Sequence, residues 1–265
     1  MRQTLFQRAC ARASVGMEIA AIAAEVPERI AIHSEHGRLS FAELNNQANQ
    51  VANMLRANGL QEGDALALLC GNRPEFAVVR FACHRMGLRL TPINWHLAED
   101  EIAYIVDNCD AVALFADIRV REQAQAAVSG NDRLRVKIGI GGNIPGFQPF
   151  EQSLAEYSVE NIENPSLGNM MLYTSGTTGR PKGVLHNLPD PQKAAEKQVR
   201  QRFIESQSPI VFSRNHLHIR GKDGAIVRFR PNPMQMLHYR QKKAAIKAGK
   251  PARFLVLNAR RMGFS

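Results

Sequence analysis

Residues 1–186 are predicted to form an α/β domain, a parallel sheet covered by helices on both faces, and residues 187–265 a small basic α+β segment. In the first part, short apolar runs alternate with stretches of helical periodicity, as in parallel strands joined by helices. The charge also changes near His186, with 17 Lys and Arg against 20 Asp and Glu before it and 17 against 4 after it. Such asymmetry indicates two segments with different histories or different partners.

The first helix is predicted to begin after Ser40. Ser40 and Glu43 form a capping-box signature, in which each residue satisfies the other's free backbone N–H. Apolar residues then recur at helical spacing, at Leu44, Ala48, Val51 and Leu55. Gly59 ends the helix, because glycine readily takes the left-handed conformation that follows a helix end.

Strands and helices alternate through the rest of this domain. The predicted strands are residues 65–70, 88–93, 111–115 and 169–173. The predicted helices are residues 73–86, which Gly87 ends, and residues 98–108. The second of these helices has an acidic first turn, which suits the positive end of the helix dipole.

Composition places the chain among ordinary globular proteins, with 45% hydrophobic and 22% charged residues. No apolar run approaches the roughly 20 residues of a membrane span, so no span is predicted. Arg8, Arg12 and Glu18 interrupt the N-terminal apolar stretch, which argues against a secretory signal. The four cysteines lack both metal-ligand spacing and a disulfide framework: Cys10, Cys70, Cys83 and Cys109. A cytoplasmic location is therefore predicted.

The strongest chemical signal is a loop after the strand at 169–173, within the string YTSGTTGRPKG (173–183). Glycines let the backbone approach phosphate oxygens, exposed N–H groups form an anion-binding nest, and Ser and Thr hydroxyls add donors. Lys182 adds a positive charge. A generic Gly/Ser-rich stretch would be interpreted as a flexible surface loop, but the full string favours phosphate binding.

YTSGTTGRPKG resembles the phosphate-binding signature of the adenylate-forming superfamily, which includes acyl-CoA synthetases, firefly luciferase and peptide-synthetase adenylation domains. The resemblance covers about residues 25–186, through LSFAELNNQANQVANMLRANGLQEGD (39–64) and FACHRMGLRLTPINWHLAEDEIAYIVDNCDA (81–111). The residues at 93–96, Ile-Asn-Trp-His, favour the acyl-CoA synthetase branch. Trp95 and His96 are interpreted as packing residues without an assigned role. The implied fold is an incomplete adenylate-forming N-terminal domain.

This resemblance implies that ATP and a carboxylic acid, expected to be a fatty acid, form an acyl-adenylate, and that the acyl group then passes to coenzyme A. Mg²⁺ would accompany the ATP. No catalytic residue is assigned. The residues implied to hold the ATP phosphates are Thr174, Ser175, Gly176, Thr177, Thr178, Gly179 and Lys182.

The family pattern stops after His186. The later YGxTE-like and RTGD-like segments and the C-terminal lid with its lysine are not found. The chain is therefore expected to be a fragment that is inactive alone. Its sheet is expected to have unpaired edges and exposed apolar faces, with poor solubility as the consequence.

The basic segment is predicted to contain a helix at 192–206, a hairpin of strands 217–220 and 225–229, and a later helix capped by Asn232. About residues 195–265 resemble the start of a phage terminase large subunit, the DNA-packaging ATPase. The resemblance implies a second nucleotide site, cut at its phosphate-binding loop, formed by Gln235, Arg260, Arg261, Gly263 and Ser265. His216 and His218 are interpreted as surface residues, and no metal site is predicted.

Three hypotheses follow from these features. The first is an acyl-CoA synthetase fragment fused to the start of a terminase, by recombination or a joining error. The second is a fragment of a DNA-packaging ATPase. The third is a non-catalytic nucleotide- or nucleic-acid-binding fusion, with non-specific DNA contact through the basic residues of 187–265.

Overall fold

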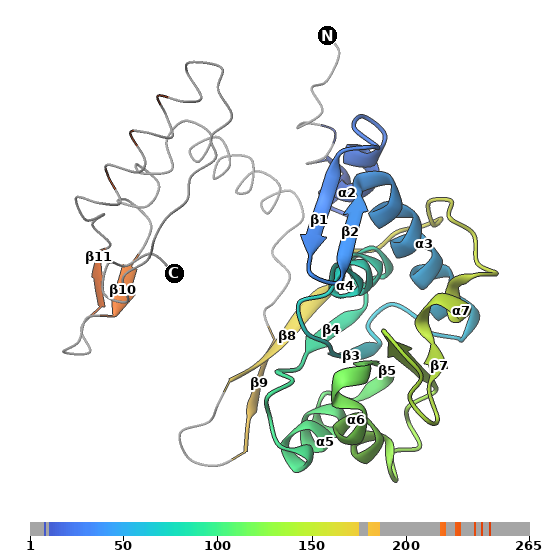
Figure 1. Cartoon of the computed structure of the whole chain (residues 1–265), viewed down its shortest axis with the longest axis vertical. Coiled ribbons are helices and arrows are strands. Elements are labelled where there is room, and N and C mark those ends of the chain that lie inside the picture. Colours follow the sequence, from blue (N-terminus) through green and yellow to red (C-terminus); the bar gives the residue numbers. More distant parts are fainter. Residues whose placement is uncertain are drawn as a thin grey trace. The chain divides into compact units, whose positions relative to one another are not determined.

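A computed structural model describes residues 8, 11–174, 180–185, 218–220 and 226–228, and the single positions 236, 240 and 244 (Figure 1). The chain separates into two compact units, Met1–Ala195 and Glu196–Ser265. Each unit is described here by itself. The boundary predicted near His186 stays a prediction.

The first unit is built around a seven-stranded sheet with the order β7-β6-β5-β3-β4-β8-β9. All neighbouring strands are parallel except β8 and β9, which form an antiparallel pair. The strands are β3 (Ala65–Leu69), β4 (Arg89–Pro92), β5 (Ala111–Asp117), β6 (Val136–Ile140), β7 (Gln148–Pro149), β8 (Asn169–Thr174) and β9 (Lys182–Leu185).

Helices cover both faces of this sheet, as predicted (Figure 1). Alternate residues of the central strands enter two separate cores: Leu66 and Leu68 enter one, and Ala67 and Leu69 enter the other. The first core is covered by α2 (Glu18–Ala23), α3 (Phe41–Ala57), α4 (Pro74–Met86) and α7 (Phe150–Leu154). The second core is covered by α5 (Glu99–Asn108) and α6 (Arg121–Val128). The α/β fold class is therefore confirmed.

The predicted start of α3 is confirmed in atomic detail. The Glu43 amide donates to the Ser40 hydroxyl at 3.2 Å, and the Glu43 carboxylate accepts from the Ser40 amide at 2.7 Å. After the helix, Gly59 has a φ of 78°. Gly87, with a φ of 71°, ends α4 in the same left-handed conformation.

Several elements lack a sequence signal strong enough to predict them. They are α2, α6, α7, the short 3₁₀ helix Ile118–Val120, the strands β6, β7 and β9, and an antiparallel pair of β1 (Ile30–Ser34) with β2 (Gly37–Ser40). The strand β9 corrects one prediction, because Lys182 begins a strand instead of lying in a loop. Its pairing with β8 also means that the sheet is not wholly parallel.

The second unit contains an antiparallel pair of β10 (His218–Arg220) and β11 (Ile226–Arg228). This pair confirms the predicted hairpin. The turn and the helices predicted for this segment lie outside the described residues. Among the residues that are described, no helix is both long and apolar enough to cross a membrane.

Candidate functional site

The predicted phosphate-binding segment is carried by the β8–β9 hairpin at one end of the sheet. Strand β8 runs parallel to β4, with Asn169 beside Arg89 and Met170 beside Leu90. Its last residue, Thr174, therefore lies at the edge where the other parallel strands also end. In open α/β sheets, ligands bind at this carboxyl edge.

Two of the predicted site residues face each other across the hairpin. Thr174 and Lys182 are partners in the antiparallel register, and both are exposed. The other predicted phosphate contacts lie outside the described residues: Ser175, Gly176, Thr177, Thr178 and Gly179. The same holds for the predicted second nucleotide site, Gln235, Arg260, Arg261, Gly263 and Ser265. The roles of all these residues stay predictions.

The pair of Thr174 and Lys182 offers a hydroxyl and an ammonium group at neighbouring positions. An ammonium group brings three donors and a full positive charge, and a hydroxyl brings one further donor. Both groups suit phosphate oxygens, which accept hydrogen bonds and carry negative charge. Both side chains are exposed, so both are accessible to a ligand.

Gly183 follows Lys182 and leaves room for an aromatic ring. A Cβ at this position would lie 2.2 Å from Met171 Cε and 3.0 Å from the Tyr173 ring. Tyr173 is also the cross-strand partner of Gly183. A side chain at this position would have to displace the Met171 methyl group and to shift the Tyr173 ring by a few tenths of an ångström.

Four residues near the hairpin were not singled out from the sequence. The Tyr173 hydroxyl donates to Asn108 Oδ1 at 2.6 Å, and the Arg180 guanidinium lies 5.0 Å from the centre of the Tyr104 ring. Partial burial raises the pKa of Tyr173 to about 12, so its hydroxyl remains a donor at neutral pH. Tyr104 and Asn108 lie four residues apart on the predicted helix 98–108, which is the signal that could have paired them.

A second cluster of charged residues follows the carboxyl ends of β3 and β5. The chain reverses its winding here, because β4 lies on one side of β3 and β5 on the other. The helices that follow, α4 and α6, pack into opposite cores. Such a switch point is the usual ligand crevice of an open α/β sheet. The sequence alone does not reveal it, because it depends on strand order.

In this chain, two arginine–carboxylate pairs lie at this switch point. Arg73 lies 3.3 Å from Glu75, and Arg119 lies 2.9 Å from Asp117. A Cβ at Gly71 would lie 2.0 Å from a guanidinium nitrogen of Arg119, and one at Gly141 would lie 2.6 Å from Arg73. The arginines therefore cover these glycines, and each has its charge balanced by its own carboxylate.

Asp117 illustrates the electrostatics of this cluster. Burial by itself raises the pKa of Asp117, but hydrogen bonds from the side chain and backbone of Arg119 outweigh it. The net result is a pKa below the ordinary value, so Asp117 is ionised at neutral pH. Paired charges of this kind stabilise the ends of the strands.

The structure supports the interpretation of Trp95 and His96 as packing residues. Their ring centres lie 3.6 Å apart, and Trp95 packs against the second core. Arg119 lies 5.2 Å from the Trp95 ring centre, a cation–π contact that ties this loop to the end of β5.

The described cysteines are also packing residues. Cys70, Cys83 and Cys109 are free and buried, and burial raises the pKa of each thiol, to about 12 for Cys70. Such thiols are poor nucleophiles and poor metal ligands. No group of three or more His, Cys, Asp or Glu among the described residues could hold a metal ion.

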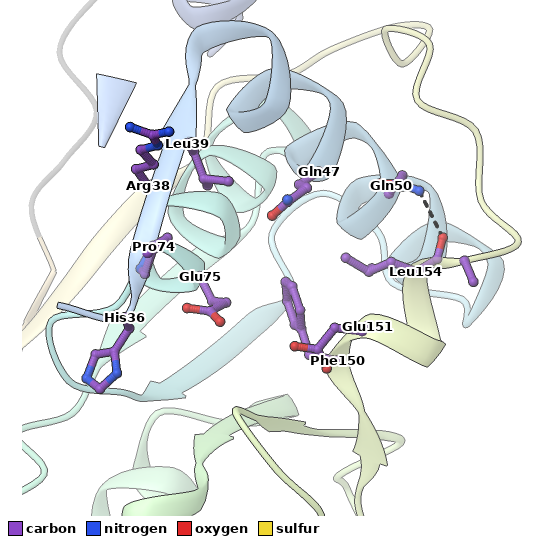
Figure 2. Close-up of a pocket in the computed structure, with 12 residues that line it drawn as sticks. His36, Arg38, Leu39, Gln47, Gln50, Pro74, Glu75, Phe150, Glu151 and Leu154 are labelled. Atoms are coloured by element: carbon purple, nitrogen blue, oxygen red, sulfur yellow. Dashed lines mark hydrogen bonds between the residues drawn. The ribbon is translucent and has the colours of Figure 1, made fainter. Parts of the chain in front are cut away.

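A pocket lies between β2, α3, α4 and α7, with a volume of about 330 Å³, and Glu75 of the arginine–carboxylate cluster lines it (Figure 2). Figure 2 shows Gln47 and Glu75 pointing into the space above Phe150, while Arg38 extends away from it. Leu39 and Leu154 supply apolar walls. This pocket contains none of the residues predicted from the sequence to bind phosphate.

The comparisons with known proteins agree with the fold and with the signature. The AMP-binding enzyme family matches residues 19–213. The chain therefore belongs to the family of AMP-binding enzymes. The match continues past the boundary predicted near His186, and the likeness of residues 195–265 to a terminase stays a prediction.

Within this family, the chain is similar to acyl-CoA ligases. It is 30% identical to 3-oxocholest-4-en-26-oate–CoA ligase of Rhodococcus rhodochrous, over 60% of the chain and 30% of the relative. It is 32% identical to indoleacetate–CoA ligase of Aromatoleum aromaticum, over 60% of the chain and 32% of the relative. The chain thus spans about a third of the length of the curated relatives it matches.

Solved structures show the same fold. The anthranilate CoA ligase AuaEII aligns with a TM-score of 0.62 and 22% identity, over 71% of this chain and 36% of that one. The N-terminal domain of FACL13 from Mycobacterium tuberculosis aligns with a TM-score of 0.55 and 28% identity, over 65% and 44%. These likenesses identify the sheet described above as the N-terminal part of the acyl-CoA ligase fold.

Proposed function

We propose that this chain supplies the polyphosphate-holding part of an AMP-forming acyl-CoA ligase. In that reaction, a carboxylate oxygen attacks the α-phosphorus of ATP, and pyrophosphate leaves. The sulfur of coenzyme A then attacks the acyl carbon, and AMP leaves. The observation that carries the proposal is the exposed pair of Thr174 and Lys182, in register at the carboxyl edge of the sheet, in a member of the AMP-binding enzyme family.

The contribution of this pair is electrostatic. Charge builds up on the departing pyrophosphate, and donors already held in place stabilise it without further reorganisation. Lys182 offers its ammonium group to the terminal phosphates, and Thr174 offers its hydroxyl from the opposite strand. The predicted contacts of residues 175–179 would complete the binding of these phosphates.

Mg²⁺ and coenzyme A belong to the proposal through the family alone. The described residues of the hairpin include no carboxylate, and no acidic cluster elsewhere in the described chain suits Mg²⁺. We therefore assign no Mg²⁺ ligand and no coenzyme A contact to this chain.

The acid is proposed to be a carboxylic acid, and a fatty acid is the expectation from the sequence. The names of the relatives cover sterol-derived, fatty, indoleacetic and carnitine-type acids. This range supports acid–CoA ligation in general more strongly than any single acid.

Calorimetric titration with inorganic tripolyphosphate tests the proposal directly. Lys182→Ala is expected to weaken binding by about tenfold, the loss of one charge-assisted contact. Arg38→Ala, which removes an exposed cation from β2, serves as the matched control and should bind as the wild type does. Equal affinity of the wild type and Lys182→Ala would contradict the proposal. Because the chain spans only a third of its relatives, we expect no acyl-CoA formation by it alone.

The charge of residues 187–265 supports a second candidate function, non-specific DNA binding. The 17 Lys and Arg there stand against only 4 Asp and Glu. Binding of this kind releases counterions and weakens steeply with salt. Fluorescence anisotropy with a labelled random duplex, measured at two salt concentrations, tests it. If no binding is measured at low salt, non-specific DNA binding is excluded. DNA-stimulated ATP hydrolysis would favour the packaging-ATPase alternative.

A further inference from the structure

Helix α5 contacts both ends of the segment that joins β8 to β9. Asn108 accepts a hydrogen bond of 2.6 Å from the Tyr173 hydroxyl, just before Thr174. Tyr104 lies one helical turn earlier, and its ring faces the Arg180 guanidinium at 5.0 Å, just before Lys182. Residues four apart on a helix share one face, so a single surface of α5 reaches both ends.

We propose that Tyr104 and Asn108 are positioning residues that fix the phosphate-binding hairpin against the body of the domain. The proposal rests on the proposed function, because it assigns these residues a part in holding Thr174 and Lys182 where a polyphosphate meets both. They act through Tyr173 and Arg180 and need not touch the ligand.

The hairpin depends on such contacts because little else holds it. Its outer residues Leu172, Val184 and Leu185 are 38–46% exposed, and among the described strands β9 has only β8 as a neighbour in the sheet. Strands β8 and β4 share two register pairs. A strand pair with so few buried side chains is expected to fluctuate unless side chains anchor it.

Tyr173 connects the contact with Asn108 to both strands of the hairpin. Its ring covers Gly183, its cross-strand partner, as aromatic residues do beside strand glycines. The neighbouring register pair is Thr174 with Lys182. A Tyr173 held by Asn108 therefore fixes the two strands at the position next to the phosphate donors.

Helix α5 is a suitable fixed reference. Ile102, Ile105 and Val106 are almost fully buried in the second core. At its C-terminal end, Arg89 donates to the Cys109 carbonyl at 2.8 Å, which ties the helix to β4. Donors held in place before binding lose less entropy when the ligand arrives, so anchoring is expected to raise affinity.

The test combines tripolyphosphate titration with hydrogen–deuterium exchange of the hairpin in the absence of ligand. In the double variant Tyr104→Leu/Asn108→Ala, we expect affinity to fall by about tenfold and exchange of residues 169–174 and 182–185 to accelerate. Tyr104→Phe keeps the ring face and should behave as the wild type. Glu99→Gln, on the first turn of α5, is the matched control. Urea midpoints identify any variant that is simply unfolded.

Each outcome decides the proposal. Unchanged exchange and unchanged affinity in the double variant would overturn it. Faster exchange with weaker binding, and an unchanged urea midpoint, would support it. If the wild type itself fails to bind tripolyphosphate, the proposed function fails, and exchange alone then tests the anchor: acceleration in the double variant supports the contact with α5, and no change removes it.

Discussion

The central strands and the β8–β9 hairpin belong to one sheet but differ in how far their side chains are buried. Every residue of β3 is buried, and its side chains alternate between two apolar cores. In the hairpin, Leu172, Val184 and Leu185 are exposed, and so are Thr174 and Lys182. Even the charged residues at the ends of the central strands are satisfied by each other, as Arg119 is by Asp117.

This difference implies that stability and ligand binding depend on different parts of the sheet. Strands whose two faces are buried use all their side chains for packing, and they form the rigid scaffold. In the hairpin, by contrast, Thr174 and Lys182 present their side chains to solvent. We therefore expect substitutions in the central strands to change the free energy of unfolding, and substitutions in the hairpin to change ligand affinity.

The largest contrast is expected between Phe115→Ala and Leu172→Ala. Phe115 in β5 is fully buried and packs edge-on against Phe150, with ring centres 6.4 Å apart. Its truncation should destabilise the domain by about 3–5 kcal/mol, through lost transfer energy and a cavity. Leu172→Ala in β8 should cost about 0.5 kcal/mol, because the side chain is already exposed to water. Urea unfolding measures both, and equal costs would erase the distinction between the two regions.

Asn49→Ala should have the next largest effect. Arg85 is fully buried, and its guanidinium donates to the side-chain oxygens of Asn49 and Asn45. Burial lowers the pKa of Arg85 to about 10, so the charge persists at neutral pH and needs these partners. Losing the Asn49 contact should cost about 2–3 kcal/mol in unfolding free energy. Thr174→Ala in the hairpin is the comparison, and a similar cost there would contradict the contrast.

Ser40→Ala tests a local contribution to the buried region. It removes the hydroxyl that accepts from the Glu43 amide at the start of α3. A lost cap of this kind costs about 1 kcal/mol. Chemical denaturation with unchanged circular dichroism before unfolding would show the effect. A Ser40→Asp variant, which can still cap, should remain close to the wild type.

Asp117→Asn tests the charge pairs at the strand ends. Among these variants it is expected to change the unfolding free energy least at neutral pH. Its main effect is expected on the pH dependence of stability. Because the folded pKa of Asp117 lies below its ordinary value of 3.8, the carboxylate stabilises the fold above that pH. This stability is lost as the pH falls below about 4 through the folded pKa. The variant should therefore show a flatter loss of stability in acid. Glu156→Gln, at an exposed position, should leave the acid profile unchanged.

Much of the secondary structure could be predicted because its causes are local. Ser40 and Glu43 lie three residues apart and cap α3 as predicted, and Gly87 ends α4 for a reason contained in its own backbone. The signature at 173–183 likewise identified the family, because the type and order of its residues carry the chemistry. Short or weakly apolar elements such as β7 and α7 lacked a comparable local signal.

The arrangement of the site was decided only in the tertiary structure. The order of the strands places Asp117, at the end of β5, beside the end of β3, and the antiparallel return of β9 sets Lys182 opposite Thr174. The contact of Tyr173 with Asn108 joins residues 65 positions apart. Sequence patterns report on neighbours within a few residues, whereas these contacts depend on how separate elements pack. The sequence by itself thus determined the family and those elements whose signals are local, and packing determined how the elements are arranged around the signature.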